Sequence, residues 1–144
     1  MVTMSIQGVA LNPDEIKLIR DALLVNFQQL STLLPEDIKV EGGIRPSTLT
    51  LHRDRTFETI KAMDLEGYPF VSDAGGVEAV VMIDGKLLHT AHAMQIRTSI
   101  ESYCWECSEN RHKGSKNTRA ANMVTWKALE RLRSIVQHGV RVTA

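Results

Sequence analysis

The sequence predicts an α+β fold, a small and mostly antiparallel sheet with helices packed on one face. Residues 77–90 form two short strand-like runs around Asp84-Gly85, a two-residue turn signal typical of a β-hairpin. Long segments with apolar residues three and four apart precede and follow this hairpin. Strands and helices are interspersed, but no repeating β-α-β pattern indicates a parallel sheet. The composition, 43% hydrophobic and 24% charged over 144 residues, is that of one globular domain spanning 1–144.

The N-terminal part of the chain predicts a strand followed by a long helix. Residues 2–7 alternate apolar and polar side chains, which is the period of a strand. Asn12 and Pro13 then indicate a helix start, because Asn caps helices and Pro is tolerated at the first helical position. Apolar residues continue at helical spacing to about Leu34: Ile16, Ile19, Leu23, Phe27, Leu30 and Leu34.

The middle of the chain predicts a further strand and a short helix. Residues 47–52 alternate again, so we expect a strand there. Asp54 is a suitable cap for a helix that runs to about Leu65. The hairpin of residues 77–90 follows and supplies the remaining strands of the sheet.

The C-terminal part of the chain predicts an antiparallel helical hairpin. Helical patterns cover residues 91–111 and 118–138, and the short connection 112–117 favours antiparallel neighbours. Gly139 is expected to end the second helix, after which residues 140–142 could add an edge strand.

Each of these two helices is predicted to carry a core face and a second apolar patch. The predicted core face of the second helix is Ala121, Val124, Ala128, Leu132 and Ile135. The opposite patches contain Met94 and Trp105 in the first helix and Met123 and Trp126 in the second. Three interpretations are open: packing inside the monomer, a homo-oligomer interface, or a site for a ligand or partner. We expect a homo-oligomer.

Charge is unevenly distributed along a chain that is neutral overall, with 17 basic and 17 acidic side chains. This balance argues against a general nucleic-acid coating protein, which needs a basic excess. Residues 111–141, however, hold 8 basic side chains and one acidic side chain. Such a segment is either a solvated helix face or a docking surface for phosphate or an acidic partner.

The connection between the two C-terminal helices is the most suggestive stretch for function. Cations gather beside a predicted helix start, where unpaired backbone N–H groups favour an anion. An aromatic residue two turns along could stack on a base whose phosphate is held nearby. The residues expected to bind a phosphate-bearing ligand are Arg111, His112, Lys113, Lys116, Arg119 and Trp126.

The two cysteines form a short motif with metal-ligand spacing. Cys104 and Cys107 are followed by His112 and Asn117, so the segment resembles a retroviral-type zinc knuckle, Cys-x2-Cys-x4-His-x4-Cys. It departs from that pattern because Asn117 occupies the place of the last cysteine, and an amide is a poor zinc ligand. Cys104, Cys107 and His112 are therefore weak metal candidates. We favour the alternative that both cysteines are small buried residues of the helix.

Histidines and arginines elsewhere suggest a second binding site or an enzyme. Arg53 and Arg55 lie at the predicted strand-to-helix junction, a place where anions can bind. His52 and Asp54 lie at the same junction, and His89 and His92 lie near the start of the first C-terminal helix. A small hydrolase could use these four residues for acid–base chemistry. No phosphate-binding loop, dinucleotide fingerprint, nucleophile elbow or zinc-protease motif is present, so we expect neither catalysis nor a cofactor.

The sequence therefore predicts a non-catalytic, oligomeric protein that binds a nucleotide or nucleic acid through its basic C-terminal hairpin. The alternatives are an inhibitor or adaptor that binds a host protein, of the kind that phages and mobile elements encode, and the small hydrolase. No apolar run is long enough for a membrane span, and the N-terminus lacks the features of a signal peptide. We expect a cytoplasmic protein, because two cysteines do not make a disulfide framework.

Overall fold

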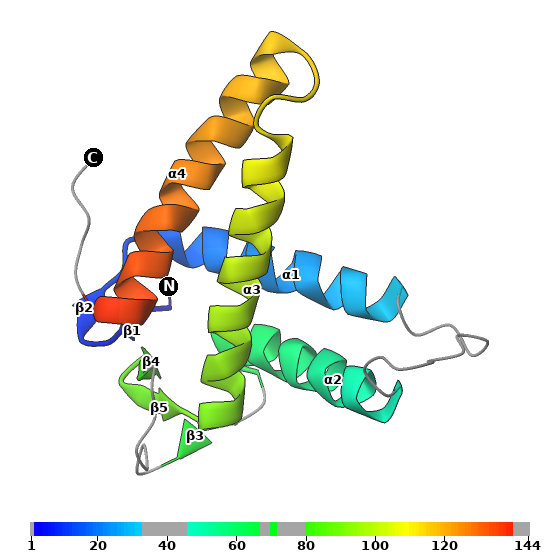
Figure 1. The fold of residues 1–144 in the computed structure, drawn as a ribbon. Helices are drawn as coiled ribbons and strands as arrows, with labels where there is room; N and C mark the ends of the chain where they lie inside the picture. The colour runs from blue at the N-terminus through cyan, green and yellow to red at the C-terminus, as the bar shows by residue number, and fades with distance from the viewer. Residues whose placement is uncertain (1, 33–45, 67–69, 72–79, 140–144) are drawn as a thin grey trace.

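The computed structural model describes residues 2–32, 46–66, 70–71 and 80–139 and confirms the α+β fold (Figure 1). The described residues form four helices and a five-stranded antiparallel sheet. In chain order the elements are β1 (Met4–Ile6), β2 (Val9–Ala10), α1 (Pro13–Thr32), α2 (Pro46–Met63), β3 (Phe70–Val71), β4 (Val81–Ile83), β5 (Lys86–Leu88), α3 (Thr90–Asn110) and α4 (Lys116–His138).

The sheet has the strand order β2-β1-β4-β5-β3 and is built around two tight hairpins. Asp84 and Gly85 both have positive φ, 50° and 77°, as the two central residues of a type I′ turn require. The predicted hairpin is thus confirmed for its described strands, β4 and β5. Gln7 and Gly8 have almost the same φ values, 51° and 77°, and join β1 to β2 in a hairpin that the sequence analysis missed.

α1 begins where the sequence predicted. The Asn12 side chain accepts a hydrogen bond from the Glu15 backbone N–H (2.8 Å), and the Glu15 carboxylate accepts one from the Asn12 N–H (2.9 Å). This reciprocal arrangement satisfies two backbone donors that would otherwise be unpaired at the helix start.

The predicted strand at residues 47–52 is wrong, because these residues belong to α2. Leu49 and Leu51 are two residues apart, as on one face of a strand, but Leu49 is buried whereas Leu51 is 45% exposed. Further along α2, Thr56 and Thr59 are both fully buried. Their hydroxyls donate to backbone carbonyls one turn earlier, those of His52 and Arg55 (both 2.7 Å). With their hydroxyls paired, the threonines fill positions that apolar residues normally occupy.

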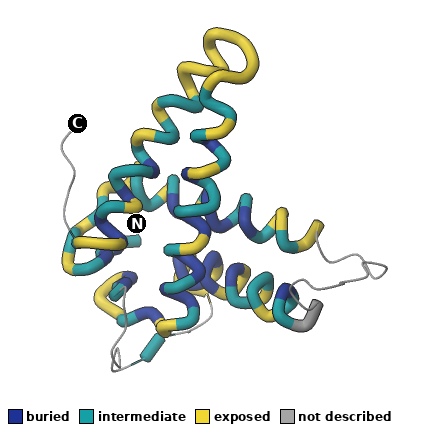
Figure 2. Tube along the Cα trace, viewed as in Figure 1, coloured by how far each residue is buried: buried dark blue, intermediate teal, exposed yellow. Residues whose placement is uncertain are grey.

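One hydrophobic core joins the sheet to all four helices. It is centred on one face of β1, β4 and β5, and Figure 2 shows the buried segments gathered where the helices cross beside the sheet. The fully or almost fully buried side chains include Ile6, Ile19, Leu23, Val81, Ile83, Leu88, Ile96, Ile100, Leu129, Leu132 and Ile135.

α3 and α4 form the predicted antiparallel hairpin, whose connected end projects away from the core (Figures 1 and 2). Ser115 caps α4 by accepting a hydrogen bond from the Thr118 N–H (3.2 Å), and Gly139 ends α4 with a left-handed φ of 65°. Every residue from 112 to 121 is exposed. We call residues 111–119 the hairpin tip.

The core face predicted for α4 is correct only in its C-terminal half. Leu132 and Ile135 are buried, but Ala121 is exposed and Val124 is 70% exposed. The reason is that the N-terminal half of α4 extends beyond the sheet and has α3 as its neighbour there. Its inner side in that half is formed by residues such as Asn122 and Trp126.

Parts of other predictions lie outside the described residues. These are the end of the N-terminal helix at Leu34, the first part of the 77–90 hairpin, and the edge strand at 140–142.

Candidate nucleic-acid interface

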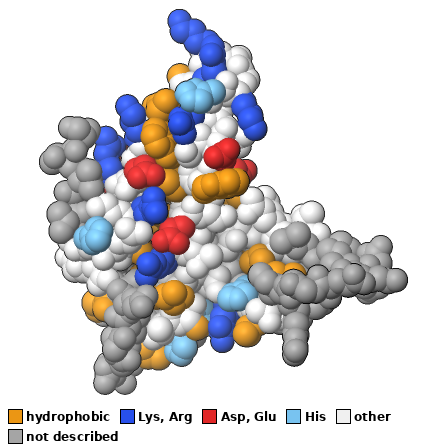
Figure 3. Space-filling model, viewed as in Figure 1, with side chains coloured by type: hydrophobic (Ala, Val, Ile, Leu, Met, Phe, Trp, Pro, Cys, Tyr) orange, Lys and Arg blue, Asp and Glu red, His pale blue; other side chains and the backbone are white. Residues whose placement is uncertain are grey.

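The hairpin tip concentrates positive charge at the end of the molecule farthest from the sheet. Lys113, Lys116 and Arg119 are exposed, and within the described part of the chain none of them forms an ion pair. His112 is exposed beside them. Figure 3 shows Lys and Arg side chains around this projecting end. Such cations are free to contact phosphate oxygens.

Arg111 and Trp126, both predicted to touch the ligand, contact each other. The Arg111 guanidinium lies 5.0 Å from the centre of the Trp126 ring, in a cation–π arrangement. One guanidinium nitrogen also donates to the backbone oxygen and the hydroxyl of Ser108, at 2.9 and 2.6 Å. Trp126 is half-buried and packs against the core, so this pair fastens α4 to the end of α3.

A pocket of about 390 Å³ lies on one side of the helical hairpin, next to this pair. Two indole rings help to line it, and Trp105 is 68% exposed whereas Trp126 is half-buried. The other lining residues are Glu101, Cys104, Ser108, Glu130 and Arg133. In the sequence, Trp105 belongs to an apolar patch for which we expected a homo-oligomer contact, with packing inside the monomer and a ligand or partner site as alternatives. Glu101, Glu130 and Arg133 were not expected in any site.

The two carboxylates of this pocket have positive partners on their own helices. Glu101 is paired with Arg97 (3.5 Å) and Glu130 with Arg133 (3.8 Å). Both pairs are partly exposed, so they contribute little to stability, but they balance the charge of the pocket. Positive charge in excess is therefore found at the hairpin tip and not in the pocket.

The cysteines are not arranged as a metal site. Both lie in the unbroken helix α3 and are buried, as we favoured. Burial first, and then the hydrogen bond that its thiol donates to Glu130 (3.2 Å), raise the pKa of Cys104 to about 12. Burial also raises the pKa of Cys107. No group of three His, Cys, Asp or Glu side chains among the described residues could hold a metal ion.

The histidines proposed for a hydrolase meet where α2 packs against α3. His92 is 8% exposed, and its Nε2 lies 2.7 Å from a carboxylate oxygen of Glu58. The Gln95 side-chain amide donates to Nδ1 of His52 (2.9 Å), and Nδ1 of His89 accepts from the Ala91 N–H at the start of α3 (3.1 Å). These contacts join the two helices and cap α3.

The acidic residue predicted to serve these histidines has a different partner. The Asp54 carboxylate accepts hydrogen bonds from its neighbour Arg53 (3.2 and 3.3 Å) and is exposed. Glu58, one turn further along α2, is the carboxylate that lies beside His92. Arg53 and Arg55 lie on α2, away from the hairpin tip, so the structure does not bring them together with the tip cations (Figure 1).

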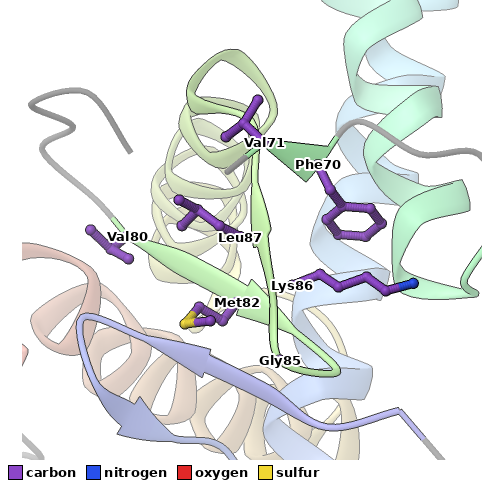
Figure 4. Close-up of a pocket in the computed structure, with 7 residues that line it drawn as sticks. All are labelled: Phe70, Val71, Val80, Met82, Gly85, Lys86 and Leu87. Atoms are coloured by element: carbon purple, nitrogen blue, oxygen red, sulfur yellow. The ribbon is translucent and has the colours of Figure 1, made fainter. Parts of the chain in front are cut away.

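A second pocket, of about 660 Å³, lies at the sheet (Figure 4). It is lined mainly by apolar side chains, and the cross-strand neighbours Met82 and Leu87 belong to it. In β4 and β5 these two residues alternate with buried ones, so their side chains point to the side of the sheet that faces away from the core. Among the residues that line this pocket, Lys86 carries the single charge, so the pocket does not gather positive charge as the hairpin tip does.

Comparison of the chain with protein-family models, with curated proteins and with solved structures finds no match. In the part of the chain that the structure describes, no helix combines the length and the apolar character needed to cross a membrane.

Proposed function

We propose that this protein is a non-catalytic nucleic-acid-binding protein whose hairpin tip contacts the phosphate backbone. The observation that carries the proposal is the position of the tip cations. Lys113, Lys116 and Arg119 project from the body on a helical hairpin, without acidic partners among the described residues. A chain whose charges cancel overall thus has a local region of strong positive potential.

The arrangement favours a polymer over a single nucleotide. A mononucleotide site holds its phosphate in a concave pocket with several converging groups. The tip cations are instead spread over the exposed turn and the first turn of α4, which suits successive phosphates of one strand. A nucleotide remains the other member of the ligand class predicted from the sequence, and the experiment below includes it.

The test is a titration of labelled oligonucleotides and a labelled mononucleotide at two salt concentrations. The variant Lys113→Ala/Lys116→Ala should bind the oligonucleotides more weakly, and its salt dependence should be shallower by about one unit for each lost phosphate contact. The matched control, Lys17→Ala/Lys61→Ala, removes the same charge from α1 and α2 and should bind as wild type.

Two results would overturn the proposal. One is that the wild-type protein binds no oligonucleotide below high micromolar concentration. The other is that the tip variant and the control lose equal affinity, since this would show an effect of net charge alone. Tight binding of the mononucleotide with little salt dependence would assign the site to a small ligand.

A protein-binding adaptor is the second candidate, and the homo-oligomer that we predicted belongs with it. Trp105 and Val124, 68% and 70% exposed, favour it because large exposed apolar side chains on a projecting element often mark a contact surface. Native mass spectrometry of the wild-type protein and of Trp105→Ala measures the oligomeric state directly. A dimer that Trp105→Ala dissociates would support a protein contact at this position.

A further inference from the structure

Trp105 is available for stacking in a way that Trp126 is not. It lies on the outer side of α3 and exposes 68% of its surface, whereas the Arg111 guanidinium covers the Trp126 ring at 5.0 Å. A base that approaches the hairpin would have to displace Arg111 to reach Trp126. The Trp105 ring can be contacted without any such rearrangement.

The pocket beside Trp105 has the chemistry of a site for an uncharged ring. Its two carboxylates are balanced by Arg97 and Arg133, so neither a bare phosphate nor a cation is strongly favoured there. Carboxylate oxygens accept from the amino groups and ring N–H groups of bases, and Arg133 can donate to base carbonyls. The Cys104 thiol is buried at the pocket wall and donates to Glu130.

The distance between Trp105 and the hairpin tip suits a short stretch of one strand. Trp105 lies five residues before Asn110, the last residue of α3, which corresponds to about 7.5 Å along the helix at the rise of 1.5 Å per residue. The hairpin tip begins at the next residue, and at about 3.4 Å for each nucleotide of a stacked strand this length corresponds to about two nucleotides. A base can therefore rest on Trp105 while phosphates of neighbouring nucleotides reach the tip cations.

Resting on the proposed nucleic-acid function, we infer that the ligand is a single strand and that Trp105 is the surface on which one of its bases stacks. In a duplex both faces of each internal base are covered by its neighbours, so an exposed indole has no ring to stack on. In this arrangement the phosphates and the base are bound at two different places on the hairpin. Lys113, Lys116 and Arg119 hold phosphates, and Trp105 holds a base.

The experiment compares Trp105→Ala and Trp105→Phe with the wild type, using one oligonucleotide of about 12 nucleotides as a single strand and as a duplex. Trp105→Ala should weaken single-strand binding about 5- to 150-fold, and Trp105→Phe should keep most of the affinity because a ring remains. The salt dependence should be unchanged in both variants, since no ionic contact is removed. Val124→Ala, a change at a similarly exposed apolar residue outside the pocket, should bind as wild type.

A second readout detects stacking directly. In Trp126→Phe the single remaining indole is Trp105, and its fluorescence should be quenched by the single strand and not by the duplex. Thermal unfolding of each variant checks that it is folded, which is expected for changes at so exposed a position as Trp105.

The outcomes separate this inference from the proposed function. If oligonucleotides bind but Trp105→Ala matches wild type, or if the duplex binds more tightly than the single strand, the stacking role is wrong and the phosphate-binding tip still stands. If no oligonucleotide binds, both are wrong. If Trp105→Ala instead dissociates a dimer and leaves oligonucleotide affinity intact, Trp105 is a protein contact and the inference is wrong.

Discussion

Two apolar residues of α4 that the sequence pattern places on one core face should differ sharply in their contribution to stability. Leu132 is fully buried in the core, whereas Val124 is 70% exposed. Leu132→Ala removes three carbon groups, worth about 2.4 kcal/mol at about 0.8 kcal/mol each, and leaves a cavity. We expect a loss of about 3 kcal/mol in the free energy of unfolding. Val124→Ala should change it by less than about 0.5 kcal/mol.

Urea denaturation followed by far-UV circular dichroism measures both values, with the slope of the transition expected to stay constant. In thermal unfolding, Leu132→Ala should lower Tm by about 6–12 °C. A loss above about 1 kcal/mol for Val124→Ala would refute the placement of α4, because it would mean that Val124 is buried in solution. Equal losses for the two variants would restore the face predicted from the sequence.

Three further predictions concern single residues. The Cys104 thiol should react with iodoacetamide at neutral pH only after the protein unfolds. Because its folded pKa, about 12, exceeds the unfolded value, the stability that the buried thiol contributes should be lost as pH rises above about 9, and alkaline denaturation of wild type and Cys104→Ala measures this loss. The hydrogen bond that Asp84 accepts from the Thr3 N–H (2.7 Å) lowers the pKa of Asp84, so the stability that this carboxylate provides should be lost as pH falls through its folded pKa. When the urea midpoint is measured as a function of pH, Asp84→Asn should therefore lose less stability at acid pH than the wild type. Gly139→Ala should destabilise by about 1 kcal/mol or more in urea denaturation, because φ is 65° and the added Cβ would lie 3.0 Å from the Gln7 carbonyl oxygen.

The features that could be predicted from the sequence are those fixed by local chemistry. Asn12 beside Pro13, the Asp84-Gly85 turn and Gly139 each act through one or two neighbouring residues, and each stands where it was expected. The strand predicted at residues 47–52 is wrong because Leu49 and Leu51, two residues apart, are typical of a strand face, whereas in α2 Leu49 is buried and Leu51 is exposed. Further along α2, the burial of Thr56 depends on a hydrogen bond to the preceding turn, which no pattern of apolar residues reveals.

The candidate site could be predicted only in part, for a different reason. A run of cations is visible in any sequence, and the tip residues are indeed exposed together on one projecting element. Which tryptophan is free, however, depends on where α4 lies relative to α3. Helical periodicity gives the angle between two side chains of one helix but not the position of the neighbouring helix. For that reason the sequence pattern indicates Trp126, and not Trp105, as the residue that stacks on a base.

The projecting half of the hairpin has little core of its own, so polar contacts must hold the two helix ends together. Asn122 donates to the Asn110 backbone oxygen (3.1 Å), Ser115 caps α4, and Arg111 joins Ser108 to the Trp126 ring. These contacts fix the connection between the helices, which in turn fixes where the tip cations stand. Arg111 and Trp126 are thereby occupied in holding the tip together. Among the described residues of the hairpin, the side chains that none of these contacts uses include Trp105 on its side and His112, Lys113, Lys116 and Arg119 at its end, and our proposal assigns the ligand to this group.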